Sequence, residues 1–388
     1  MTSQPAQTES ADLPDELAAS GRTRVALVFG GRSEEHAISC ATAASVLRAL
    51  DRERYAVIPI GITRDGHWVL LEDDPEPLEI RDGRLPEVLD TGRQVIFPMG
   101  GRDHLLRLVE PDGSVSRLGE VDVVFPLLHG PFGEDGTIQG MLEMADVRYV
   151  GCGVLSSAAM MDKHVMKLIF AAAGLHVGPY VVADDLSWRR DKAAVLDAAA
   201  SLTFPVFVKP ARAGSSVGVY KVDRPEDLEA AVDKARDHDP KVLIEQGITG
   251  REIECAVLQG RETDAPRVSE CGEIVVVGEG HEFYDFEAKY LDESSVQIQV
   301  PADVPDTVRA EVRRVAEVAF EAAGCEGLAR VDCFVTSAGE VIINEINTMP
   351  GFTPFSMYPH AWAGSGLPYP ELVDELLQLA LARPLGLR

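Results

Sequence analysis

The chain has 388 residues, 46% of them hydrophobic, and its 36 Lys and Arg stand against 63 Asp and Glu, for a formal charge of −27. This length exceeds what one hydrophobic core usually covers, so two or three domains are expected. Because so acidic a surface repels a phosphate backbone, we expect no nucleic acid partner. A nucleotide site in such a chain needs local lysines and a divalent cation to compensate the charge.

The start of the chain and its apolar runs predict where the protein works. Residues 1–22 are polar and acidic, unlike a signal peptide, and are expected to form a disordered tail. No apolar run approaches the roughly 20 residues that cross a membrane. The six cysteines show neither C-x-x-C spacing nor the density of a disulfide scaffold. We therefore expect a cytoplasmic protein with reduced thiols and no membrane partner.

Apolar runs separated by a glycine turn and a helical stretch open the ordered part of the chain. Residues 24–30, 55–61 and 121–128 are predicted to be strands, with a helix ending near residue 50 between the first two. This pattern is typical of an open α/β sheet, whose ligands bind at the carboxyl ends of the strands. The segment 71–120 has weak periodicity and is predicted to form hairpins and loops.

The rest of the chain predicts a smaller α/β unit and then a second sheet. The smaller unit is expected to contain a helix over 156–173, strands over 205–210, 217–222 and 241–246, and a helix over 227–236. The last part is expected to contain a helix over 306–323, strands over 328–336 and 340–346, and a C-terminal helix over 371–381.

The two strands joined by a Ser-Ala-Gly turn carry the most informative polar residues. Side chains alternate between the faces of a strand, so Arg330 and Asp332 share one face, as do Glu345 and Asn347. If the strands pair in simple register, Asp332, Glu345 and Asn347 converge as three oxygen ligands of the kind that Mg²⁺ takes. The alternative is a solvated strand face. The apolar runs around both carboxylates argue against it, because unpaired charge is costly there.

A second polar segment places Lys209 at the end of an apolar strand, before the sequence ARAGSS at 211–216. Glycine allows backbone N–H groups to approach a phosphate, and an ammonium supplies the opposing charge. The loop alone is a weak signal, since the chain has neither a Walker loop nor a dinucleotide-binding fingerprint. From the residues alone, we predict a metal-nucleotide site with an arginine beside it.

Seven segments occur together and in order: FGGRSEEHAIS (29–39), LLHGPFGEDGTIQGMLE (127–143), MDKHVMK (161–167), VKPARAGSSVGV (208–219), EFYDFEAKY (282–290), GLARVD (327–332) and NEINTMPGFTPFSMYP (344–359). From Arg24 onward the chain resembles the D-alanine–D-alanine ligase family of the ATP-grasp superfamily. The resemblance implies an α/β (α+β) fold of three domains: an N-terminal open α/β sheet at 23–151, a central ATP-grasp subdomain at 152–246 and a C-terminal ATP-grasp domain at 247–388. ATP would lie between the last two.

The resemblance also implies the reaction. ATP would convert the carboxylate of one D-alanine to an acyl phosphate, and the amine of a second D-alanine would attack it, giving the dipeptide for peptidoglycan with ADP and phosphate. Asp332, Glu345 and Asn347 would hold two Mg²⁺ ions, or Mn²⁺, and the protein would be a homodimer. Another carboxylate–amine ligase of the superfamily and a catalytically silent relative are the alternatives. The segments 282–290 and 347–359 argue against the first, and the intact metal ligands and Arg330 argue against the second.

Further roles follow from the same resemblance. Glu35 would bind the first ammonium with His129 nearby, while Arg330 and the N–H of Gly351 would form an oxyanion hole. The second carboxylate would be received by Lys289 and Ser356. The expected catalytic residues are Glu35, His129, Ser215, Tyr290, Arg330, Gly351 and Ser356. The expected binding residues for ATP and substrate are Lys163, Phe207, Lys209, Ser215, Ser216, Glu245, Gln246, Ile248, Glu252 and Lys289.

Residues 282–295 would form a mobile loop that closes over the site, because an acyl phosphate hydrolyses unless water is excluded. In the family this loop is locked by a Glu, Ser and Tyr network, here Glu35, Ser215 and Tyr290. An ordinary exposed loop is the alternative. The resemblance also implies that Tyr290 favours D-alanine over D-lactate as the second substrate.

Overall fold

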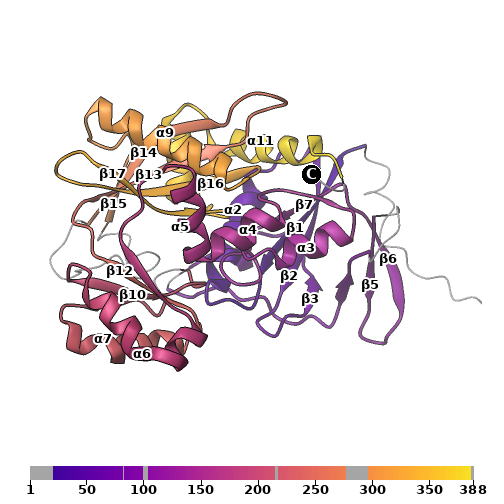
Figure 1. Cartoon of the computed structure of the whole chain (residues 1–388). Coiled ribbons are helices and arrows are strands. Elements are labelled where there is room, and N and C mark those ends of the chain that lie inside the picture. Colours follow the sequence, from indigo (N-terminus) through magenta and orange to yellow (C-terminus); the bar gives the residue numbers. More distant parts are fainter. Residues whose placement is uncertain (1–20, 82, 99–103, 215–216, 277–295, 386–388) are drawn as a thin grey trace, which may run out of the picture.

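The computed structural model describes residues 21–81, 83–98, 104–214, 217–276 and 296–385. Three sheets organise these residues. In Figure 1 the eight-stranded sheet lies at the right, the four-stranded sheet at the lower left and the five-stranded sheet at the upper left. The α/β class expected from the sequence is confirmed. Within the described part of the chain, every helix is too short or too polar to span a bilayer.

The first sheet has the strand order β6-β5-β4-β3-β2-β1-β7-β8. Its strands are β1 (Thr23–Gly30), β2 (Tyr55–Ile62), β3 (Trp68–Leu70), β4 (Gln94–Ile96), β5 (Leu105–Val109), β6 (Val115–Glu120), β7 (Val123–Pro126) and β8 (Arg148–Tyr149). β2, β1, β7 and β8 run parallel, and β2 is buried along its whole length, as strands covered on both faces are. β3 pairs antiparallel with β2. β4, β5 and β6 form the antiparallel pairs expected within 71–120, where a short 3₁₀ turn, η1 (Glu76–Leu78), also lies.

Helices cover both faces of this sheet. Apolar side chains of α2 (His36–Ala49) and of the C-terminal helix α11 (Tyr369–Ala382) share a core with one face, and α3 (Thr137–Met144) packs on the other. The C-terminal helix thus packs against the N-terminal sheet, and the first and last parts of the chain have one hydrophobic core.

The four-stranded sheet is antiparallel, with the order β11-β10-β12-β9. Its strands are β9 (Tyr180–Ala183), β10 (Val206–Pro210), β11 (Tyr220–Val222) and β12 (Val242–Gln246). The helices of this part are α4 (Val154–Met161), α5 (Lys163–Ala172), α6 (Asp185–Ala200), η2 (Pro225–Asp227) and α7 (Leu228–Arg236). Side chains of α6 and α7 pack with the sheet into a separate small core.

The five-stranded sheet is also antiparallel, with the order β15-β14-β13-β16-β17. Its strands are β13 (Arg251–Leu258), β14 (Arg267–Val276), β15 (Val296–Gln299), β16 (Leu328–Val335) and β17 (Val341–Asn347). The helices α9 (Asp306–Ala322) and α10 (Met357–Gly364) pack on it. The apolar positions that predicted α9, Val308 and Val312 among them, are buried.

The single helix expected over 156–173 is wrong. Asp162 leaves the helical conformation, so that α4 ends at Met161 and α5 begins at Lys163. The Asp162 side chain accepts hydrogen bonds from the backbone N–H groups of His164 and Val165, both at 3.1 Å, which is the role of an N-cap. The periodic apolar residues continue through both helices and hid this break.

Two strands are shorter than expected, and the cysteines are as predicted. The strand expected over 217–222 spans only Tyr220–Val222, because Gly218 has a positive φ of 72° and belongs to a turn. The strand expected over 121–128 spans Val123–Pro126. All six cysteines are buried free thiols.

Candidate active site

Loops at the carboxyl ends of β1 and β7 meet the segment that follows β17. The hydroxyl of Ser33 donates to the carbonyl oxygen of His129 at 2.8 Å. His129 is buried, and its Nδ1 lies 3.0 Å from the carbonyl oxygen of Met349. Its Nε2 has no hydrogen-bond partner among the described residues. The first and third sheets therefore meet at His129, which keeps one ring nitrogen for a further partner.

Glu35 lies directly before α2, and its carboxylate reaches two glycine loops. A carbon added to Gly130 would lie 3.0 Å from Oε2 of Glu35, and one added to Gly214 would lie 3.2 Å from the same atom. Gly130 follows β7, and Gly214 belongs to the loop after β10. Glu35 therefore stands between the eight-stranded sheet and the loop predicted to bind phosphate.

Glu134 belongs to the same place, although the sequence did not indicate it. Its Oε2 accepts the N–H of Gly130 at 2.7 Å, and its Oε1 accepts the N–H of Met349 at 3.1 Å. Burial and then the charge of Glu35 raise the pKa of Glu134 to about 8, against the opposing effect of the two N–H groups. The signal that could have identified Glu134 is that it is an acidic residue in the same turn as His129.

The hairpin of β16 and β17 places the three predicted metal ligands together. Asp332 pairs with Glu345 across the ladder and Arg330 with Asn347, before an irregularity after Asp332. The amide Nδ2 of Asn347 donates to Oδ2 of Asp332 at 3.0 Å. The simple register assumed from the sequence therefore holds at the functional end of the hairpin.

Arg330 lies between two carboxylates. Its Nε and Nη2 donate to the two oxygens of Asp332 at 2.7 and 2.6 Å. Its Nε also lies 2.7 Å from Oε2 of Glu254, on the neighbouring strand β13. Burial disfavours the charged guanidinium, but the charges of Asp332 and Glu254 outweigh it and hold the pKa of Arg330 well above its ordinary value. Glu254 was not predicted from the sequence. The signal that could have identified it is its spacing of two residues from Glu252, which puts both side chains on one face of the strand.

The acidic cluster fits a divalent cation. Glu254, Asp332 and Glu345 bring three negative charges, against one from Arg330 and one from Lys163, whose Nζ lies 3.9 Å from Glu345. No described group of three His, Cys, Asp or Glu side chains is arranged to hold a metal. The predicted set of two carboxylates and an amide would therefore need further oxygens, such as those of phosphate and water.

Two lysines expected to bind ATP lie near this cluster, Lys163 at the start of α5 and Lys209 on β10 of the four-stranded sheet. The Nζ of Lys163 donates to the carbonyl oxygen of Ala213 at 2.8 Å, in the loop after β10. Lys209 forms an ion pair with Glu245, whose other oxygen lies 3.2 Å from Nζ of Lys167. Burial favours the neutral form of both lysines, and it lowers the pKa of Lys167, whereas Glu245 and then Glu345 outweigh it and raise the pKa of Lys209.

Lys167 is a second residue that the sequence did not single out. It is buried and comes one helical turn after Lys163 in the segment MDKHVMK, so the spacing put both ammonium groups on one face of α5. Because Glu245 has two lysine partners, one of them is available to a phosphate without leaving that carboxylate unpaired.

Further residues expected to bind ATP lie on β10, at the end of β12, in the segment after it and near the start of β13. Phe207 is half-buried on β10 and shares a strand face with Lys209. Gln246 is half-buried, and its side-chain oxygen accepts the backbone N–H of residue 203 at 3.1 Å. Ile248 is half-buried in the segment after β12, and Glu252 is exposed near the start of β13. The backbone N–H of Gln246 donates to the carbonyl oxygen of Pro179 at 3.0 Å.

Gly351 and Ser356 lie together after β17. A carbon added to Gly351 would lie 3.1 Å from Oγ of Ser356, which also accepts the N–H of Thr353 at 3.1 Å. Ser356 directly precedes α10. Four predicted residues lie outside the described residues: Ser215, Ser216, Lys289 and Tyr290. The loop predicted over 282–295 also lies outside them.

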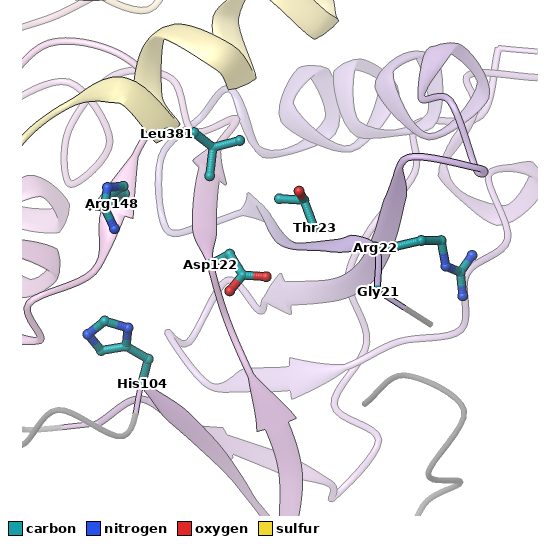
Figure 2. Close-up of a pocket in the computed structure, with 7 residues that line it drawn as sticks. All are labelled: Gly21, Arg22, Thr23, His104, Asp122, Arg148 and Leu381. Atoms are coloured by element: carbon teal, nitrogen blue, oxygen red, sulfur yellow. The ribbon is translucent and has the colours of Figure 1, made fainter. Parts of the chain in front are cut away.

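Two cavities lie at opposite ends of the parallel strands. One of ≈ 310 Å³ is lined by Ser33, His129 and Phe132 among others, at the carboxyl ends. The other, of ≈ 360 Å³, is lined by Asp122, Arg148 and Leu381 among others, at the amino ends (Figure 2). Because α/β sheets bind ligands at the carboxyl ends, the cavity of Figure 2 is not part of the candidate active site.

Two antiparallel sheets with facing lysines and an acidic hairpin define an ATP-grasp ligase, and solved structures support this class. The VanG D-Ala:D-Ser ligase of Enterococcus faecalis superposes with a TM-score of 0.78 at 34% identity, covering 92% of this chain and 99% of that one. The D-alanine–D-alanine ligase of Coxiella burnetii gives 0.76 at 32% identity, covering 93% and 94%.

Sequence comparison identifies the family. A model described as D-ala D-ala ligase N-terminus matches residues 24–152, and one described as D-ala D-ala ligase C-terminus matches 169–378. A D-alanine–D-alanine ligase of Paenarthrobacter aurescens is 60% identical over 95% of this chain and 97% of its own length. One of Streptomyces coelicolor is 52% identical over 94% and 95%. The chain belongs to the D-alanine–D-alanine ligase family.

Proposed function

We propose that this site joins two D-alanines through an acyl phosphate. The chain is an ATP-dependent D-alanine–D-alanine ligase for peptidoglycan synthesis, as its family membership gives. A carboxylate is a poor electrophile, so the γ-phosphoryl group of ATP must first be transferred to it. The observation that carries the proposal is the hairpin of Arg330, Asp332 and Glu345, where Nζ of Lys163 lies 3.9 Å from Glu345 and the charge of Glu345 also acts on Lys209.

ATP would lie between the four-stranded and five-stranded sheets. Adenine would contact Phe207, Ile248 and the backbone of Glu245 and Gln246, with Glu252 on the ribose. Lys163, Lys209 and Lys289, with Ser215 and Ser216, would bind the phosphates, as ammonium and hydroxyl groups do.

Asp332, Glu345 and Asn347 would hold the metal, two Mg²⁺ ions or Mn²⁺. A bound divalent cation neutralises phosphate charge during phosphoryl transfer. The hairpin supports this assignment, because it brings the carboxylates of Asp332 and Glu345 and the amide of Asn347 together.

The first D-alanine would lie near His129, with its ammonium on the carboxylate of Glu35. The amine of the second attacks the acyl phosphate, and the oxyanion that forms would accept hydrogen bonds from Arg330 and the N–H of Gly351. Ser356 and Lys289 would bind the second carboxylate. When the amide forms, the C–O bond to phosphate breaks, the nitrogen gives up a proton, and phosphate leaves carrying that proton.

Several finer features stay part of the proposal. We place the domain boundaries at 151/152 and 246/247. We also propose that the enzyme is a homodimer and that it works in the cytoplasm. The lock of Glu35, Ser215 and Tyr290 would close the loop over the acyl phosphate and exclude water. Tyr290 would favour D-alanine over D-lactate.

Phosphate release tests the proposal. Purified protein with ATP and Mg²⁺ should release phosphate when D-alanine is added, and D-cycloserine, a D-alanine mimic, should inhibit it. L-alanine should not replace D-alanine, and mixtures of D-alanine with D-lactate or D-serine should yield mainly the D-alanyl-D-alanine dipeptide. Phosphate release that did not depend on D-alanine would refute the proposed reaction. A depsipeptide as the main product would refute the role of Tyr290.

A further inference from the structure

Glu254 is a buried carboxylate with no assigned role in the reaction, and it contacts the arginine of the proposed oxyanion hole. Its side chain is 6% exposed, and its Oε2 lies 2.7 Å from Nε of Arg330. In the ladder between β13 and β16, Glu254 stands opposite Asp332. The guanidinium of Arg330 therefore touches carboxylates from two adjacent strands.

Asp332 has a second partner besides Arg330. Asp332 uses both oxygens for Arg330, and Oδ2 also accepts from Asn347. Asp332 is also a proposed metal ligand. A cation bound to Asp332 neutralises the carboxylate that faces the guanidinium, and it also repels the guanidinium. A guanidinium held by Asp332 alone would therefore be displaced when the metal-nucleotide binds.

We propose that Glu254 is a positioning residue, which holds Arg330 over the reacting carboxyl group while the cation occupies Asp332. The proposal rests on the proposed function of Arg330. Glu254 remains the counter-ion of the guanidinium in the loaded site, so that the Nη atoms can donate to the developing oxyanion once the cation occupies Asp332. Two carboxylates around one arginine thus have separate tasks: one holds the metal and the other holds the arginine.

The test compares Glu254→Gln with Glu254→Asp, which keeps the charge on a shorter side chain. Glu273→Gln is the matched control, since Glu273 is also buried and pairs with an arginine, Arg251, in the same sheet at Nε–Oε1 2.7 Å. We expect Glu254→Gln to lower kcat about 10-fold to 100-fold, as loss of a supporting partner does, with KM for ATP little changed. Glu254→Asp should recover part of kcat, and Glu273→Gln should keep it.

Nucleotide binding separates a positioning role from metal ligation. In calorimetric titration with ADP and Mg²⁺, Glu254→Gln should bind like wild type, whereas Asp332→Asn should bind more weakly. Equal weakening in both variants would make Glu254 a metal ligand and overturn the proposal. Because this titration contains no D-alanine, it does not depend on the proposed reaction. Failure of the proposed function would be seen separately, as phosphate release by the wild-type protein that does not depend on D-alanine.

A double substitution tests whether Glu254 acts through Arg330. In the Arg330→Lys background, adding Glu254→Gln should lower kcat much less than it does alone, because the partner that it positions is already lost. If Glu254→Gln lowered kcat as much in the Arg330→Lys background as it does alone, the proposal would be refuted. If neither Glu254 variant folded while Glu273→Gln did, the ion pair would be structural and the proposal wrong.

Discussion

The residues around Glu134 determine whether its carboxyl group is charged. His129 and Glu134 belong to one turn after β7, and both contact the backbone of Met349 beyond β17. One carboxyl and one imidazole therefore connect the eight-stranded sheet to the five-stranded sheet. Because Glu134 is buried beside Glu35, its proton is retained where an exposed glutamate would have lost it.

Replacing Glu134 by Gln should change how stability depends on pH. The pKa of Glu134 is raised from 4.5 to about 8, so its contribution to folding is complete below 4.5 and is lost as pH rises through about 8. Gln does not titrate. The free energy of unfolding of the variant, relative to wild type, should therefore increase over this range. Urea unfolding at several pH values measures it, and a difference that is constant with pH would contradict the raised pKa.

At the scale of elements, the break between α4 and α5 decides where Lys163 lies. Asp162 caps α5 and pairs with Nζ of Lys241, which directly precedes strand β12, at 2.8 Å. The first residue of the capped helix is Lys163, which reaches the loop after β10. A local capping interaction thus fixes one of the proposed phosphate ligands.

Asp162→Ala should therefore affect both stability and nucleotide binding. Loss of the cap and the ion pair should cost about 1–2 kcal/mol in urea unfolding, and KM for ATP should rise several-fold. Asp184→Ala is the control, because Asp184 caps α6 through Leu186 and Ser187 in the same way, at 2.9 and 3.0 Å, away from the proposed site. It should lose similar stability and keep KM. Equal changes of KM in both variants would contradict the role of the cap.

The elements also show what sequence could and could not predict. Strands β1 and β2 and helix α9 follow from local apolar patterns, and the pairing of Asp332 with Glu345 follows from a short hairpin. The contacts of Glu254 with Arg330 and of Glu134 with Met349 could not be found in this way, because these partners are distant in the chain and only strand pairing and loop packing bring them together. The break at Asp162 was missed because side-chain capping leaves the apolar periodicity unchanged.

At the scale of the whole molecule, the hydrophobic cores do not follow chain order. Phe125 of the first sheet packs with Phe352, Tyr358 and Leu376, close to the C-terminus. Among the described residues, the buried core of the four-stranded sheet runs from Ala183 to Ile244, and Val181 packs against it. The ends of the chain thus share a core, and the middle has its own.

Native-state hydrogen exchange should show this difference. Backbone amides of β9, β10 and β12 should exchange through an opening of lower free energy than those of β1 and β16, because the small core can open without exposing the shared one. ADP with Mg²⁺ should slow exchange in the four-stranded sheet more than in β1. A single opening free energy for both sets, with and without nucleotide, would contradict independent opening.

The cavity at the amino ends of the parallel strands has a consequence for chain connectivity. Gly21 and Leu381 both line it, so the two ends of the described chain lie beside one another (Figure 2). A circular permutant that joins these ends by a short flexible linker, and is cut in the exposed turn at residues 112 and 113 between β5 and β6, should keep the fold, since neither change crosses a core. The order in which the three sheets emerge during synthesis could then be altered without altering the site.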